Sequence, residues 1–306
     1  MKKFIHLELK GGLGNQLFQY YAGFYSSNIS NRILIFDERQ VKNEIFFKSR
    51  IQSGMQINGL KQVKGIENIY LRLSKRNIIL FDNKVVQKFK KIIMPKSFLN
   101  FSPKGDTGTI LDPSVFNFKN NHARVLKLSG YFQSPKIVSE AIKLGALTQI
   151  ECKNPSKELT FYLNQSKKLS PIGIHIRLLD YYSDIPIIKI KNYILQSVSY
   201  FREQSIDSPL WFFSDNLEYL NRILPEELKS SESAYFGPKD FTDVETLVLL
   251  SSCKYLILSR STFSYWAGFF QKSQLVAYPD PISLENDFEN YDLLSVVPAS
   301  WRKISF

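Results

Sequence analysis

Residues 3–37 read KFIHLELKGGLGNQLFQYYAGFYSSNISNRILIFD, and this stretch decides the fold. Apolar and polar side chains alternate over residues 3–9, which is typical of a short strand. After a glycine-rich turn, apolar side chains recur at helical spacing over residues 15–27, with Asn15 as the expected N-cap. A second apolar strand follows at 33–36. Strand, helix and strand in this order predict a parallel α/β sheet.

Further along, strands and helices alternate clearly. Strands are expected at 172–176, 210–214, 234–236, 255–258 and 274–278, and helices at 136–144, 190–204, 217–224, 243–252 and 262–271. The polar segment 152–157 has the composition of a domain joint. Residues 40–125 show no clear period, although 78–81 are apolar. The sequence therefore predicts two Rossmann-like α/β domains, 1–152 and 153–306, facing each other across a cleft.

The chain of 306 residues carries a formal charge of +12. No compact basic motif typical of nucleic-acid binding is present, because Lys88, Lys90, Lys91 and Lys96 are interleaved with apolar side chains. Attraction to an anionic membrane surface and to a phosphorylated small molecule remain, beside a surface charge that only aids solubility.

Metal and disulfide chemistry are not expected. Cys152 and Cys253 cannot form a disulfide framework, and His6, His122 and His175 are far apart in sequence. The amino-terminal residues lack the long apolar region of a signal peptide, and nowhere do 18 apolar residues follow one another. We expect a cytoplasmic protein that could act peripherally at the inner face of the membrane.

The glycine-rich turn at 11–14 resembles a dinucleotide-binding loop, and Asp37 lies at about the right spacing for a ribose contact. Leu17 occupies the third glycine position, however, which disfavours NAD and FAD. A tight turn without a ligand is one alternative. The other is a turn that borders the cleft through its backbone N–H groups and side-chain amides, at Gly12, Gly14, Asn15 and Gln16.

His175 and Arg177 share one face at the carboxyl end of strand 172–176. Ligands of open α/β sheets bind at this end. A guanidinium there can bind phosphate oxygens in a bidentate manner and offset the charge of a departing diphosphate. The alternative is a local ion pair between Arg177 and Asp180.

Residues 259–266 read SRSTFSYW, following a buried strand and opening a helix. The hydroxyls of Ser259, Ser261 and Thr262 are thus offered together with free backbone N–H groups, where an anion would be stabilised. Ordinary helix capping by Ser261 or Thr262 is the alternative.

Together, five blocks resemble the α-1,2-fucosyltransferases of glycosyltransferase family 11, particularly the short bacterial members. In family order these blocks are GGLGNQLFQY at 11–20, GYFQS at 130–134, HIR at 175–177 with Asp180-Tyr181, FSDN at 213–216 and SRSTFSYW at 259–266. The family usually reads His-x-Arg-Arg-Gly-Asp-Tyr, whereas Leu178 and Leu179 stand here in place of the second Arg and the Gly.

The resemblance implies a GT-B arrangement with an acceptor-side domain at 1–152 and a nucleotide-sugar domain at 153–306. It also implies an inverting, metal-independent transfer of L-fucose from GDP-fucose, a co-substrate rather than a cofactor. The expected acceptor is a hydroxyl, O2 of a galactose-like residue, on an oligosaccharide that could be lipid-linked, as in O-antigen synthesis. No nucleic-acid partner is expected.

Within this scheme Arg177 binds the donor diphosphate. Asp180 is the first candidate for the base that takes the acceptor proton, and His175 is the second. Asp215 and Asp243 could bind the guanine or ribose, or could cap helices. Because the loop after Arg177 departs from the family pattern, another GDP-deoxyhexose donor stays open, as does a non-catalytic protein that binds GDP or a glycan.

Overall fold

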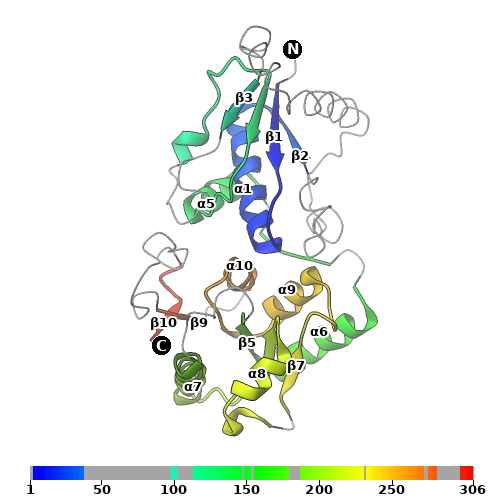
Figure 1. Ribbon diagram of the computed structural model, residues 1–306, viewed down its shortest axis with the longest axis vertical. Coiled ribbons are helices and arrows are strands. Elements are labelled where there is room, and N and C mark those ends of the chain that lie inside the picture. The colour runs from blue at the N-terminus through cyan, green and yellow to red at the C-terminus, as the bar shows by residue number, and fades with distance from the viewer. Residues whose placement is uncertain are drawn as a thin grey trace, which may run out of the picture.

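The computed structural model describes residues 3–37, 98–101, 113–146, 148–152, 155–178, 187–230, 232–271, 275–280 and 297–305. These residues form two α/β domains that follow one another along the longest axis of the molecule (Figure 1). The apolar segment 78–81 and the four lysines between 88 and 96 lie outside the described residues, as does Asp180. So do residues 153 and 154, and the domain boundary stays a prediction.

The amino-terminal domain contains a four-stranded sheet in the order β2-β1-β4-β3, with every neighbouring pair parallel. Its strands are β1 (Phe4–Glu8), β2 (Ile33–Asp37), β3 (Phe98–Phe101) and β4 (Val125–Leu128), and its helices are α1 (Leu13–Ser30), the 3-10 helix η1 (Pro113–Phe116) and α5 (Pro135–Lys143). Helix α1 connects β1 to β2 and contacts both strands, which completes the predicted β-α-β unit.

The carboxyl-terminal domain contains a six-stranded parallel sheet in the order β10-β9-β8-β5-β6-β7. Its strands are β5 (Ile172–Ile176), β6 (Leu210–Ser214), β7 (Ala234–Phe236), β8 (Tyr255–Ile257), β9 (Val276–Pro279) and β10 (Arg302–Ile304). Its helices are α6 (Lys157–Leu169), α7 (Ile187–Glu203), α8 (Leu217–Ile223), η2 (Glu226–Leu228), α9 (Asp243–Ser252) and α10 (Thr262–Phe270).

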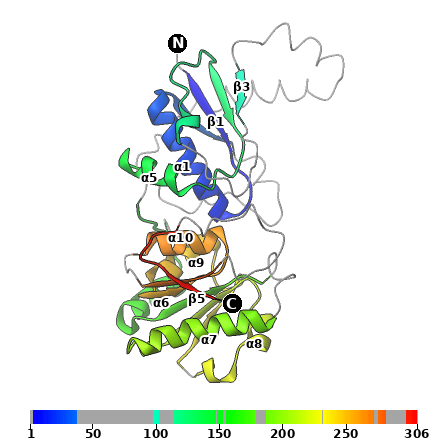
Figure 2. The same ribbon diagram turned by 90° about the vertical axis from the view of Figure 1, so that its left-hand side faces the viewer.

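Alternating side chains determine which helices cover each face of this sheet. Ile174 and Phe212 pack with residues of α7 and α8, whereas Trp211 and Phe213 pack in the cluster that includes α9 and α10. Figure 2 shows α7 and α8 on the side away from the amino-terminal domain, with α9 and α10 on the side facing it. Both faces are therefore covered, as a parallel sheet requires.

The predicted α/β class is confirmed, and strands 172–176 and 210–214 have the predicted bounds. The predicted cap of the first helix is wrong. Helix α1 begins at Leu13 and its N-cap is Gly12, which has no side-chain cap hydrogen bond within the described part of the chain. Asn15 therefore lies inside the first turn of the helix.

The two domains touch where α1 meets α10. The indole Nε1 of Trp266 donates a hydrogen bond of 2.8 Å to the carbonyl of Gly14. The Trp266 ring also stacks on Tyr21, with ring centroids 4.8 Å apart, and lies 4.7 Å from the Phe18 centroid. One apolar cluster thus runs from the amino-terminal core into the carboxyl-terminal core.

Gly14 permits this approach. A Cβ at this position would lie 2.5 Å from Thr262 Oγ1 and 2.6 Å from the backbone nitrogen of Phe263. Since backbone atoms cannot rotate away, any larger residue must push the two helix N-termini apart.

Gly14→Ala should lower the free energy of unfolding by about 1–3 kcal/mol through this overlap, although alanine normally favours a helix. Chemical denaturation monitored by circular dichroism measures the change. Gly23→Ala is the matched control on the same helix, because its Cβ would meet the flexible ends of Leu7 and Leu34. Equal losses in the two variants would contradict a special role for the contact at Gly14.

Candidate active site

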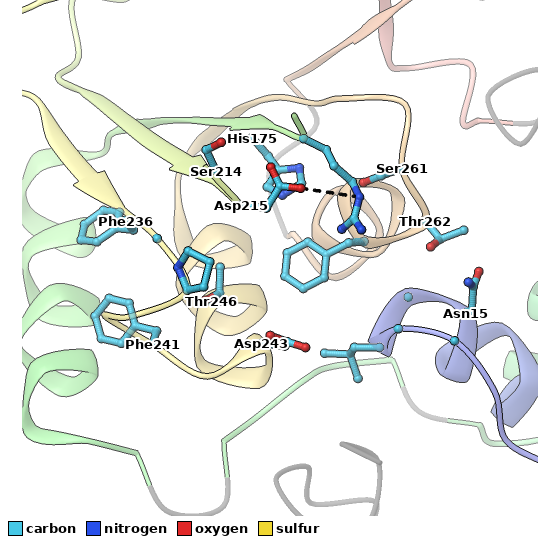
Figure 3. A pocket seen from close by; sticks show the side chains of 18 of the residues that line it. Asn15, His175, Ser214, Asp215, Phe236, Phe241, Asp243, Thr246, Ser261 and Thr262 are labelled. Carbon is cyan, nitrogen blue, oxygen red and sulfur yellow. Dashed lines mark ion pairs between the residues drawn. The ribbon is translucent and has the colours of Figure 1, made fainter. Parts of the chain in front are cut away.

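A cleft of about 700 Å³ lies between the domains at the carboxyl ends of the strands. In Figure 3, Phe236 and Phe241 lie at one end of it and Asn15 and Thr262 at the other. The residues lining it come from the β1–α1 turn, the ends of β5 and β6, the β7–α9 segment and the start of α10. This is the edge at which open α/β sheets bind ligands.

Arg177 follows β5 and lines the cleft, half-buried. Its Nε lies 3.8 Å from Asp215 Oδ2, at the end of the neighbouring strand β6 (Figure 3). Asp215 Oδ1 also accepts a hydrogen bond of 2.7 Å from the backbone N–H of Leu178. Asp215 is thus a local partner of Arg177 and holds the chain just after it. The alternative pair with Asp180 falls outside the described residues.

The amino end of α10 forms a second positive element. Ser261 is its N-cap and accepts a 3.0 Å hydrogen bond from the backbone N–H of Ser264, so the capping interpretation is correct for this residue. Ser261 and Thr262 also line the cleft. Ser259 does not, because it is fully buried beneath them.

The amino end of α1 approaches the same place from the other domain. Gly12, Gly14 and Asn15 line the cleft, and the Asn15 side-chain oxygen accepts a 2.8 Å hydrogen bond from Gln133 Nε2. Gln16 is buried and does not line the cleft. Its amide instead donates to the Gly11 carbonyl at 2.8 Å, which supports the turn from behind.

His175 lines the cleft, although it is buried. Its Nδ1 lies 2.6 Å from Ser264 Oγ and 3.0 Å from Ser259 Oγ. Burial lowers the pKa of His175 to about 3, and the nearby charge of Arg177 acts in the same direction. The ring is therefore neutral at physiological pH. Because its pKa is so low, it is a weak base.

The opposite end of the cleft was not predicted, although Asp243 was. It is lined by Thr246 and by Phe236 and Phe241, whose rings are largely buried, while Asp243 lies between this end and Asn15 (Figure 3). Asp243 does not cap α9, because Thr242 is the N-cap and forms a capping box with Glu245. Asp243 lines the cleft (Figure 3). In the sequence, the Thr-x-x-Glu box identifies Thr242 as the cap.

The described residues contain no group of three or more His, Cys, Asp or Glu side chains that could hold a metal ion. Over the same residues, no helix combines the length and the hydropathy needed to cross a membrane.

The cleft offers a guanidinium and two helix N-termini at one end, an apolar wall of Phe236 and Phe241 at the other, and the Asp243 carboxylate between them. An elongated ligand with an anionic part and a flat polar part matches this arrangement.

Two similar proteins are glycosyltransferases by name. The chain is 26% identical to an alpha-1,2-colitosyltransferase of Escherichia coli over 97% of each chain. It is 22% identical to the O-antigen biosynthesis glycosyltransferase WbnK of Escherichia coli, covering 85% of this chain and 88% of the relative.

Among solved structures, the fucosyltransferase NodZ from Bradyrhizobium superposes with a TM-score of 0.51 at 12% identity, over 89% of this chain and 94% of NodZ. That likeness shows the fold, which is the GT-B-like arrangement of two α/β domains. The profile of Glycosyl transferase family 11 matches residues 4–292. The chain belongs to glycosyltransferase family 11.

Proposed function

We propose that this glycosyltransferase moves a 6-deoxyhexose from a GDP-linked donor to a hydroxyl of an oligosaccharide, with inversion and without a metal ion or other cofactor. One observation carries the proposal. Arg177 and the amino ends of α1 and α10 meet at one end of the cleft, where their positive charge can hold a diphosphate.

The guanosine would extend toward the aromatic end of the cleft. Phe236 and Phe241, although largely buried, give this end an apolar wall against which a base can pack, and Asp243 and Thr246 offer polar atoms for its edge or for the ribose. A carboxylate suits guanine in particular, because the N1–H and the 2-amino group of guanine are adjacent donors.

In this mechanism the acceptor hydroxyl attacks the anomeric carbon as the bond to the GDP oxygen breaks. Negative charge grows on the departing diphosphate, and Arg177 with the two helix ends stabilises it in place of a metal. Asp180 stays our candidate for the base that takes the acceptor proton, on sequence grounds alone. His175 is a poorer candidate because its pKa is about 3.

Two donor sugars deserve direct comparison. L-Fucose follows from the family, while the relative named as a colitosyltransferase suggests colitose, which lacks the 3-hydroxyl of fucose. Leu178 replaces the family's second Arg, yet its side chain packs in the apolar cluster under β5 and does not line the described cleft. The substitution would therefore act on the backbone around Asp215 rather than by removing a cation from the cleft wall.

We further propose that the acceptor is presented at an anionic surface, such as that of a lipid-linked oligosaccharide in a membrane. Residues 1–152 contain 24 Lys and Arg but 10 Asp and Glu, whereas residues 153–306 contain 16 and 18. The positive charge thus belongs to the acceptor-side half, while the donor half is nearly balanced.

Arg177→Ala should lower kcat/KM for transfer by about 100- to 1,000-fold, because the departing diphosphate loses a charge-assisted contact. GDP release measured over a range of donor concentrations tests this. Arg222→Ala, which removes an exposed Arg paired with Glu218, is the control and should leave transfer intact. Turnover of Arg177→Ala near the level of that control would contradict the diphosphate role.

A panel of GDP-fucose, GDP-colitose, GDP-mannose and UDP-sugars, each with and without EDTA, tests the donor class. We expect nucleotide release with acceptor only for the GDP-deoxyhexoses, and the same rate with the chelator. Preference for UDP or loss of activity in EDTA would refute the proposal. Tight GDP binding with no release for any donor would favour the non-catalytic binding protein.

Sedimentation with lipid vesicles tests the surface proposal. The protein should bind vesicles containing anionic lipid and not purely zwitterionic ones, and binding should fall as salt is raised because the attraction is screened. Equal binding to both vesicle types, or none to either, would count against it.

A further inference from the structure

We propose that Ser264 is a positioning residue that fixes His175 as a neutral hydrogen-bond donor, with the proton on Nε2 facing the cleft. The inference rests on the proposed function only for the identity of the ligand, a GDP-linked sugar. The position of the proton on His175 is proposed for the protein without a ligand.

The argument begins with the triangle formed by His175 Nδ1, Ser259 Oγ and Ser264 Oγ. The two serine oxygens are 2.8 Å apart, and both approach Nδ1. Ser264 also accepts from the backbone N–H of Ser259 at 3.2 Å. All three residues are buried, so water does not compete for these bonds.

The contacts of Ser264 Oγ are the basis for the direction that we propose for its bond to His175. Ser264 Oγ accepts the backbone N–H of Ser259, and its own proton has two acceptors within reach, Nδ1 at 2.6 Å and Ser259 Oγ at 2.8 Å. Because Nδ1 is the nearer of the two, we take the Ser264 hydroxyl as the donor and Nδ1 as the acceptor. Ser259 can then donate to Ser264 Oγ, which gives each hydroxyl proton one acceptor.

A neutral imidazole carries one proton, and with Nδ1 accepting, that proton is on Nε2. Ser264 belongs to α10 and lies behind the ring, while His175 itself lines the cleft. Nε2–H is thus presented to whatever occupies the cleft. It can donate to an oxygen of the nucleotide, but it cannot take a proton from the acceptor hydroxyl.

The surroundings keep the ring in this state. Arg177, just after the same strand, opposes a second positive charge, and burial does so more strongly. The carboxylates at the cleft, Asp215 after β6 and Asp243 on α9, act in the other direction. Against these, α10 contributes Ser264 and the Phe263 ring, 5.2 Å from the imidazole, neither of which carries a charge.

Nitrogen-15 NMR of the full-length chain labelled at histidine tests the assignment directly, because the sequence has only three histidines. His122→Gln and His175→Asn identify the signals. We expect His175 in the Nε2–H form from pH 5 to 8 without titration. A proton on Nδ1, or titration within this range, would overturn the proposal. No nucleotide is needed, so this result does not depend on the donor proposal.

Ser264→Ala should remove the hydrogen bond that holds the His175 ring in one neutral form. We expect a mixture of the two neutral forms in the same spectrum and a GDP dissociation constant raised about tenfold, the effect of one lost hydrogen bond. Ser197→Ala is the matched control, since its buried hydroxyl on α7 has no hydrogen-bond partner among the described residues. It should change neither the spectrum nor GDP affinity by more than about twofold.

An unchanged His175 spectrum in folded Ser264→Ala would refute the positioning role. If that variant does not fold, the wild-type spectrum alone decides the matter. Failure of the wild-type protein to bind GDP would instead refute the proposed donor and leave the assignment of the histidine to its own test.

Discussion

The contact between the amino ends of α1 and α10 is the constraint on which the site depends. Gly14 lets the backbone of one helix lie against Thr262 of the other, and Trp266 ties the pair with a hydrogen bond across the domains. Each helix end carries a partial positive charge, so bringing two together without a ligand costs electrostatic energy. Apolar packing around Trp266 offsets that cost, so the anion site that we propose would be assembled before the ligand binds.

The carboxylates of the cleft limit which anions this positive charge can bind. Asp215 lies beside Arg177, and its other oxygen is fixed by the Leu178 backbone, so a phosphate must compete with a carboxylate held in place. A single weak anion gains little from such an exchange. A diphosphate that also reaches the two helix ends gains more, which favours a long anionic ligand over a free small ion.

Local patterns predicted much of this fold, and tertiary contacts account for most of what they missed. Strands such as 172–176 were found because buried β-branched runs are distinctive, whereas α6 was missed because its sequence is polar and buries only Leu159 and Ser166. Cleft residues were predicted at Gly12, Gly14, Arg177 and Asp215. Ser259 and Gln16 carry the same polar groups but face inward, and a side chain's direction depends on partners distant in sequence.

His175 shows that an ionisable side chain at the cleft need not act as an acid or a base. Sequence reasoning offered His175 as the second candidate for the base, after Asp180. Burial beside Arg177 lowers the pKa of His175 to about 3, and Ser259 and Ser264 both contact its Nδ1. In the assignment that we propose, the ring is a donor that is uncharged at physiological pH. In the proposed mechanism, where the site holds an anion and then releases it as a leaving group, such a donor would add direction to the binding while Arg177 would supply the charge.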